Sequence, residues 1–281
     1  MEIILNNPFL RDFVLGGISG ATAKTVSAPL ERVKLLLQTQ ESNFQLIEKK
    51  YKSMGDCFVR IYREEGVLAY WRGNWANVLR YFPTMAFNFA FKDYFLSFNK
   101  FDPVLENKRF LAANMLSGGM AGVLCALIVY PLDFARTRLG VDIGGRQFNS
   151  LSSCLNGIVR LNGIRGIYQG LGMSLISVFT YRAMYFGFFD TGKRRIDDFL
   201  NKPLWFKFCF AQFVTAGSET LNYPTDTIRR RMMMNAGLKK KLYNNSIECT
   251  KSILKNEGIK GFYKGCFSNA VRSISSSLVL V

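Results

Sequence analysis

Acidic and basic side chains recur at one fixed spacing behind a proline in three places along the chain. Each copy reads Pro-x-acid-x-x-base, and the copies occupy residues 29–34, 131–136 and 224–229. On a helix, an acid and a base three positions apart share one face and can pair with charges on neighbouring helices. The motif therefore predicts ion pairs between helices.

A second motif follows each of the first three. It reads Gly-x4-aromatic-x-Gly at residues 66–73, 163–170 and 258–265, and a cysteine stands nine positions before its first glycine in every copy. Three matches in one register, at a period of about 95 residues, predict three units of one fold. We place them at roughly residues 9–102, 108–200 and 204–281, within a single domain of residues 1–281.

The composition excludes several kinds of chemistry and suggests an anionic partner. The chain has no histidine, which removes imidazole acid–base catalysis, Ser-His and Cys-His nucleophiles and histidine metal sites. None of the six cysteines forms a CxxC pair, so we expect buried, reduced thiols. No P-loop or nucleophile–base set is visible, so we expect neither an enzyme with catalytic residues nor a metal site. A net charge of +17 favours binding to nucleic acid, anionic lipid or anionic solutes.

Hydropathy predicts spanning helices interrupted by single charges. Residues 110–132 form an uncharged stretch long enough to cross a bilayer, whereas five similar stretches each contain one charge. These charges are Lys24, Arg80, Arg182, Glu219 and Arg272. A charge in mid-span is kept where it faces a bundle interior or a water-filled cavity. We therefore predict helices at residues 9–38, 74–98, 110–139, 173–197, 204–234 and 267–281, with the alternative of a soluble helical protein left open.

These repeats resemble the mitochondrial carrier family over essentially the whole chain. The run Arg229-Arg-Arg-Met-Met-Met234 and residues 72–83 and 181–187 resemble its ADP/ATP carrier (adenine nucleotide translocase) branch. The resemblance implies an all-α membrane protein with six transmembrane helices in three pseudo-symmetric repeats around a central cavity. It also implies a monomer in the inner membrane of a mitochondrion or a related organelle, with both termini on the intermembrane side. Its expected activity is the exchange of ADP for ATP by alternating access.

The resemblance also assigns a substrate site. Its residues would be Lys24, Arg80, Ser177, Val178, Tyr181, Arg230 and Arg272. Cationic side chains in a low-dielectric cavity would draw in and hold phosphates. The aromatic face of Tyr181 could stack on adenine, beside Ser177 and Val178.

On the family pattern, the charged motifs form a gate on the matrix side. Its expected pairs are Glu31 with Arg136, Asp133 with Arg229, and Asp226 with Lys34, and Gln38 is expected to brace the first pair. A substrate can open such a gate only if it binds the open and closed states of the protein with different affinities.

The closing glycines Gly73, Gly170 and Gly265 begin the second helix of each repeat. Free backbone N–H groups and the helix dipole favour phosphate there, and the family binds cardiolipin at such positions. Cardiolipin is the one bound partner expected besides ADP and ATP, with no other cofactor. The alternative is that each glycine only makes a turn.

Two features depart from the family pattern. Glu219 stands where the branch has a small residue, and we expect it to pair with Lys24, which lies equally far from its own proline. The family has a second gate on the opposite side, formed by the motif aromatic-acid-x-x-base near the end of the second helix of each repeat. Here only Phe189-Asp190-x-x-Lys193 is complete.

A carrier of another nucleotide or nucleotide-containing cofactor therefore stays an alternative. A basic RNA-binding protein is disfavoured, because the phenylalanines lie in the spans and no RNA-binding signature occurs.

Overall fold

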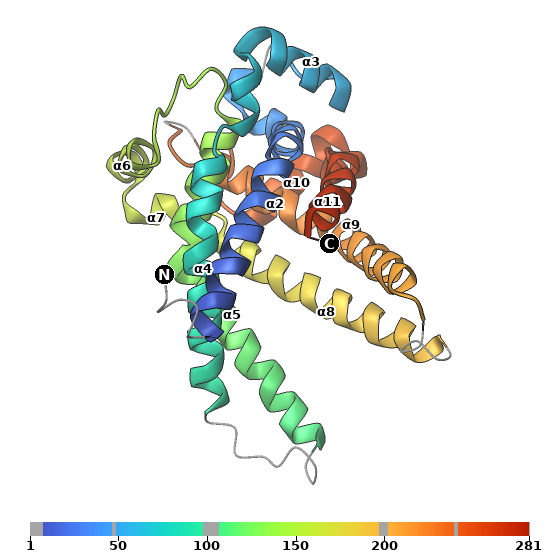
Figure 1. The fold of residues 1–281 in the computed structure, drawn as a ribbon. Helices are drawn as coiled ribbons and strands as arrows, with labels where there is room; N and C mark the ends of the chain where they lie inside the picture. The colour runs from blue at the N-terminus through green and yellow to red at the C-terminus, as the bar shows by residue number, and fades with distance from the viewer. Residues whose placement is uncertain (1–7, 47–48, 98–106, 197–201, 239–240, 281) are drawn as a thin grey trace.

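The computed structural model describes residues 8–46, 49–97, 107–196, 202–238 and 241–280, and within them it is built from helices (Figure 1). Six long helices carry the architecture of these residues. They are α2 (Pro8–Thr39), α4 (Asn74–Leu96), α5 (Asn107–Val141), α8 (Leu171–Arg195), α9 (Leu204–Met234) and α11 (Cys266–Leu280). The six predicted spans match these helices to within three residues at each described end. The predicted ends at residues 98, 197 and 281 lie outside the described residues.

Each repeat places a short amphipathic helix between its two long ones. These helices are α3 (Met54–Glu65), α6 (Leu151–Asn162) and α10 (Ser246–Glu257). A side chain caps each start, from Ser53, Ser150 and Asn245, and a glycine with positive φ follows each end. A short helical segment then leads to the next long helix: η3 (Val67–Trp71), α7 (Ile164–Ile167) and η5 (Ile259–Tyr263).

The repeated cysteines anchor these amphipathic helices. Cys57, Cys154 and Cys249 are fully buried, each one turn before a buried isoleucine, and burial raises the pKa of each thiol to about 12. All six cysteines are free thiols, as predicted. The prediction of burial is wrong for Cys209, which is exposed on α9, and for Cys266, which is only partly buried.

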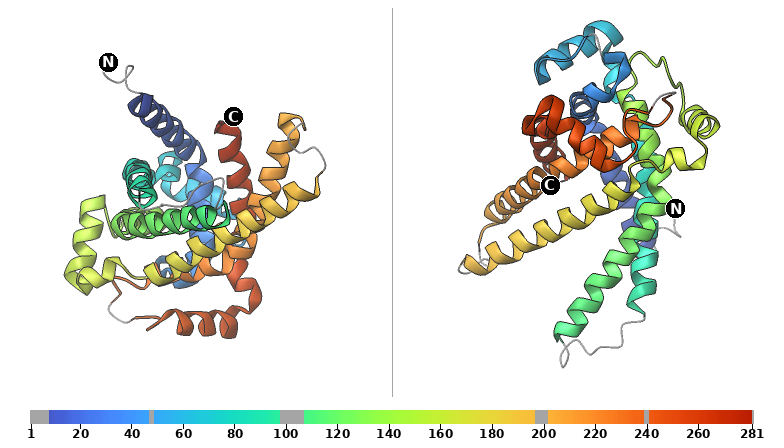
Figure 2. Two further views of the ribbon diagram at one scale, coloured as in Figure 1. Left: turned by 90° about the horizontal axis from the view of Figure 1, so that it is seen from below. Right: turned by 180° about the vertical axis from the view of Figure 1, so that it is seen from behind.

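The long helices pack mainly across repeat boundaries. The most extensive contacts join α4 to α5, α8 to α9 and α11 to α2, so each even helix packs on the odd helix of the next repeat and the third repeat closes on the first. Figure 2 shows these three pairs spreading from a common centre, with the start of α2 and the end of α11 on the same side. The odd helices continue through Pro29, Pro131 and Pro224, which places the charged motifs at that centre.

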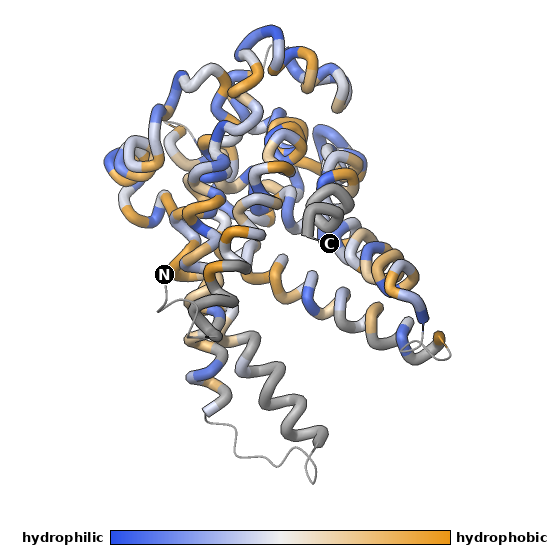
Figure 3. Tube along the Cα trace, in the orientation of Figure 1, coloured by the Kyte–Doolittle hydropathy of each residue, from blue (hydrophilic) through white to orange (hydrophobic). Residues whose placement is uncertain are grey.

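The hydropathy of the described helices agrees with the prediction that single charges interrupt most of the apolar spans. In the part of the chain that the structure describes, one segment, Met120–Val141 of α5, is long and apolar enough to cross a membrane by length and composition alone. Hydrophilic residues gather around α3 and α6 (Figure 3). Large aromatic side chains are exposed along the other long helices, including Trp75, Phe179, Phe213 and Phe267. Exposed apolar surface of this extent is expected where helices face lipid.

Candidate functional site

Three ion pairs join the odd helices where they converge. Lys34 on α2 lies 3.2 Å from Asp226 on α9, measured from Nζ to Oδ2. The other two pairs are Arg136 with Glu31, and Arg229 with Asp133. All three predicted pairs therefore form, and their side chains are only 9% to 15% exposed. We refer to these six residues as the ion-pair ring.

Gln38 braces a different pair from the one predicted. Its amide Nε2 donates to Asp226 Oδ2 at 3.2 Å and to Thr227 Oγ1 at 2.9 Å, not to the Glu31–Arg136 pair. Gln38 stands one turn after Lys34 on α2, so both side chains project from one face and reach the same carboxylate. The prediction named the wrong pair because it ignored this shared face.

Each ring carboxylate also faces a second cation from outside the ring. Arg272 Nη1 lies 3.8 Å from Glu31 Oε1, and Arg80 Nε lies 3.8 Å from Asp133 Oδ1. In the second repeat, the position equivalent to Arg80 and Arg272 is occupied by Ser177. Arg230 on α9 supplies the missing cation, 2.9 Å from Asp226. Three of the four cations expected to bind phosphate are thus already in contact with the ring.

A cavity of about 180 Å³ lies next to the ring. Its lining residues are Lys24, Glu31, Lys34, Leu35, Arg136, Arg230 and Arg272. Five of these seven side chains are cationic, so the cavity favours a multiply charged anion. Within the described residues, Lys24 Nζ has no ion-pair partner within 4 Å.

The remaining predicted substrate residues do not line this cavity. Arg80 contacts the ring through Asp133, and the Ser177 hydroxyl accepts a hydrogen bond from Asn222 at 2.9 Å. Tyr181 stacks on Tyr185 with ring centroids 6.1 Å apart, and Val178 is 37% exposed. The structure therefore brings Lys24, Arg230 and Arg272 together and leaves the predicted adenine contacts on α8 outside the lining.

Comparison with known proteins identifies the family. The family model described as "Mitochondrial carrier protein" matches residues 5–101, 107–199 and 201–281. The chain belongs to the mitochondrial carrier family. It is 47% identical to ADP/ATP translocase 2 of Tachyglossus aculeatus aculeatus, covering 97% of this chain and 95% of that protein. It is 48% identical to ADP/ATP translocase 4 of Mus musculus (97% and 88%) and 47% identical to the ADP,ATP carrier protein of Parachlorella kessleri (97% and 83%). The family predicted from the motifs is confirmed.

Glu219 of this carrier pairs with Arg272 and not, as predicted, with Lys24. Its Oε1 lies 3.3 Å from Arg272 Nη2, and its Oε2 accepts a hydrogen bond from Asn269 at 2.7 Å. Threefold pseudo-symmetry puts Glu219 and Lys24 at one depth but on different helices, α9 and α2. Helix α11 of the same repeat packs against α9 and brings Arg272 within reach.

The three closing glycines of the carrier make close contacts with the ring helices. Gly73, Gly170 and Gly265 have φ of 81°, 85° and 84°, which disfavours any side chain. A Cβ on each would lie about 3 Å from a carbonyl oxygen, which belongs to Arg136, Arg229 and Lys34 respectively. Each glycine thus packs against the basic ring residue of the next repeat, so turn geometry and close packing both require glycine there.

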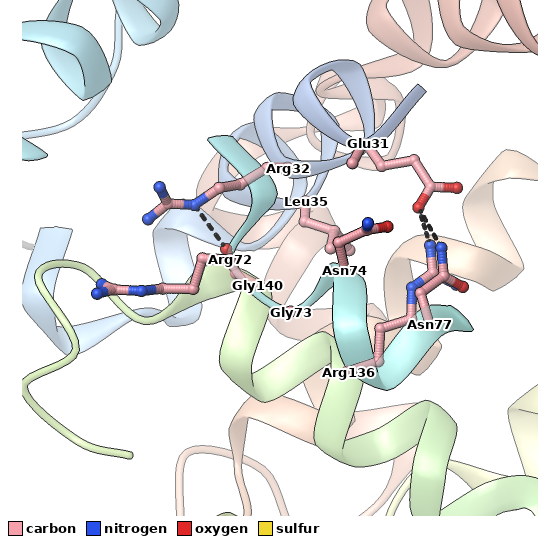
Figure 4. A pocket seen from close by; sticks show the side chains of 10 residues that line it. Glu31, Arg32, Leu35, Arg72, Gly73, Asn74, Asn77, Arg136 and Gly140 are labelled. Atoms are coloured by element: carbon pink, nitrogen blue, oxygen red, sulfur yellow. Dashed lines mark hydrogen bonds and ion pairs between the residues drawn. The ribbon is translucent and has the colours of Figure 1, made fainter. Parts of the chain in front are cut away.

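Sequence reasoning missed two asparagines that serve this network. Asn77 donates to Glu31 Oε2 at 3.1 Å, so Asn77 and Arg136 converge on one carboxylate (Figure 4). Asn269 accepts from Arg272 Nε and Nη2 at 3.2 and 3.1 Å. Both stand four positions after a closing glycine, on the face that also carries Arg80 and Arg272. That common register was the available signal.

Proposed function

We propose that this carrier exchanges ADP for ATP across the inner membrane of a mitochondrion or related organelle, as a multi-pass monomer that hydrolyses neither nucleotide. The proposal is supported by relatives named as ADP/ATP translocases and by a cavity with five cationic lining residues. The observation that carries the mechanism is the contact of Arg80, Arg230 and Arg272 with the ring carboxylates.

These contacts link substrate binding to opening of the ring. A nucleotide phosphate that binds Arg80, Arg230 or Arg272 competes with Asp133, Asp226 or Glu31 for the same guanidinium. The ring carboxylate then loses its contact with the cation outside the ring, so the closed ring is weakened only when a substrate is bound. A ligand can shift the two states only by its differential affinity for them, and this competition provides such a difference.

Because the ring is closed, we infer that this conformation is open on the side opposite the ring. By the family pattern the ring faces the matrix, so this is the state that receives nucleotide from the intermembrane side. Lys24, Arg80, Arg230 and Arg272 would bind phosphates. Tyr181, Ser177 and Val178 would approach adenine only in another state or pose, because they do not line the cavity seen here.

Cardiolipin remains part of the proposal. The starts of α4 and α8 at Gly73 and Gly170 have no side-chain cap, so backbone N–H groups are available to a lipid phosphate. Gly265 stands at the equivalent place before α11. These positions fit an anionic headgroup in addition to their packing role.

Exchange in liposomes tests the function directly. Vesicles containing the purified protein and preloaded with ATP should take up radiolabelled ADP, whereas empty vesicles should not, and no free phosphate should be released. A panel of other nucleotides and nucleotide-containing cofactors serves as the comparison. Efficient exchange of one of these without any ADP uptake would refute the assignment.

A further inference from the structure

Glu219 is a carboxylate beside the cationic cavity, where it contacts the lining residue Arg272, and the mechanism above does not use it. Its side chain is 20% exposed and faces both Arg272 and Asn269. Asn269 in turn accepts two hydrogen bonds from the Arg272 guanidinium. The three side chains form a closed triad, so Arg272 is held by a resident anion before any substrate arrives.

This triad makes the two sides of the cavity electrically different. Five positions before the proline, the first repeat has Lys24 and the third has Glu219, while Arg80 and Arg272 occupy equivalent positions on the following helices. The first repeat therefore has two cations at these positions, and Arg80 faces one carboxylate, Asp133. In the third repeat the one cation, Arg272, faces two carboxylates, Glu31 and Glu219.

Glu219 also sets the net charge of the connected site. The cationic members are Lys24, Lys34, Arg80, Arg136, Arg229, Arg230 and Arg272, and the acidic ones are Glu31, Asp133, Glu219 and Asp226. Seven cations less four carboxylates give a net charge of +3, which would be +4 without Glu219. Free ADP and ATP carry charges of about −3 and −4 at neutral pH, because each ionised phosphate adds negative charge.

We propose that Glu219 is a specificity-determining residue that biases the cavity against the more highly charged nucleotide. It competes with substrate phosphates for Arg272, which weakens the binding of both nucleotides. Its charge also repels ATP more than ADP, because ATP brings one further negative charge to the same cavity. This inference rests on the proposed exchange of adenine nucleotides.

The size of the effect follows from Coulomb's law. One extra charge several ångströms from Glu219, in a partly hydrated cavity, corresponds to a change of roughly three- to tenfold in affinity. Removing the carboxylate charge should therefore strengthen ATP binding three- to tenfold more than ADP binding. A structural role alone would change both affinities together.

The experiment compares E219Q with wild type in the liposome exchange assay without magnesium. Glutamine keeps the shape and can still accept a hydrogen bond from Asn269 or Arg272, but it has no charge. The KM values for external ADP and ATP are measured separately, and their ratio is the readout. E64Q is the matched control, because Glu64 is an exposed carboxylate on α3 paired with Arg60, and it should leave the ratio unchanged.

Two further measurements keep the inference testable if E219Q reconstitutes poorly. E219D retains the charge and should keep the wild-type ratio within twofold, while E219S provides a second neutral variant. Raising the ionic strength should reduce the difference between wild type and E219S, because salt screens the repulsion.

The outcomes separate the two proposals. Exchange of both nucleotides by wild type, with the same ATP-to-ADP ratio in E219Q and E219S, would overturn the role of Glu219 alone. An equal change of the ratio in E219D and E219Q would also overturn it, because the charge would then not be responsible. A wild-type protein that exchanges neither nucleotide would overturn the proposed function itself.

Discussion

Replacing Gly265 by alanine probes the contact between the start of α11 and the ion-pair ring. The new Cβ would lie 3.1 Å from the Lys34 carbonyl oxygen and 3.0 Å from the Tyr223 hydroxyl. The residue would also keep a φ of +84°, where alanine is strained. Gly258 is the control for strain without close contact, since its φ of +67° and ψ of −164° also disfavour a side chain and a Cβ there would meet nothing within 4 Å.

The two substitutions separate strain from close contact. The positive φ costs an alanine about 1–3 kcal/mol at either position, partly offset by about 0.4–1 kcal/mol from the stiffer unfolded chain. Overpacking adds about 1–3 kcal/mol at Gly265, where the backbone oxygen of Lys34 cannot rotate away. At about 2–4 °C per kcal/mol, Gly258→Ala should lower the melting temperature by a few degrees and Gly265→Ala by roughly 5–10 °C.

Thermal unfolding of the purified protein in detergent, with and without added cardiolipin, checks this reasoning. The greater loss for Gly265→Ala should appear in both conditions, because the contact lies within the protein. Equal losses for the two variants would refute the close-contact argument. A greater loss that appears only with cardiolipin would show that lipid binding and not packing requires the glycine.

Three further outcomes are expected from the same structure. Lys24→Met should reduce nucleotide exchange at least tenfold but leave the melting temperature unchanged or raised, because it removes a charge with no ion-pair partner among the described residues; a fall in both would contradict this. Burial would raise the pKa of Glu257, but hydrogen bonds from Arg231 and Lys264 outweigh it and lower the pKa. Its stabilisation is therefore present at neutral pH and lost as the pH falls through that lowered pKa, so melting curves of wild type and Glu257→Gln should converge in acid and not at neutral pH. At neutral pH a maleimide followed by mass spectrometry should leave Cys57, Cys154 and Cys249 unmodified in the native protein and label them after denaturation, since their thiols are buried with a pKa of about 12; labelling of native Cys154 would contradict the burial.

The repeated spacing of acid and base predicts ion pairs between the three odd helices. It allows each acid to pair with the base of the next or of the preceding repeat, and the resemblance to the family supplied the direction, which is the one observed. The bounds of the long helices could also be predicted from the sequence. Each even helix begins after a closing glycine, and each apolar span could be followed on both sides of the charge that interrupts it.

Contacts that break the repeat could not be predicted in this way. Glu219 occurs in one repeat, so its partner depends on which helix lies near it and not on any recurring spacing. The repeat symmetry predicted Lys24 as the partner of Glu219, but α9 packs against α11, and this packing brings Arg272 to Glu219 instead. The placement of Gln38 failed for a related reason, since the face it shares with Lys34 matters more than the order of the pairs along the chain.

The same departures from symmetry make the three parts of the ring unequal. Asp226 accepts hydrogen bonds from Lys34, Gln38 and Arg230, and Glu31 accepts them from Arg136 and Asn77. Among the described residues, Asp133 accepts one side-chain hydrogen bond, from Arg229. A hydrogen bond to a charged group contributes about 1.5–3 kcal/mol, so the α5–α9 pair is the weakest of the three. Arg80 is the cation outside the ring that faces Asp133, so a phosphate that binds Arg80 acts on the pair with the fewest hydrogen bonds. Opening of the ring should therefore begin between α5 and α9, with the braced Asp226 pair separating last.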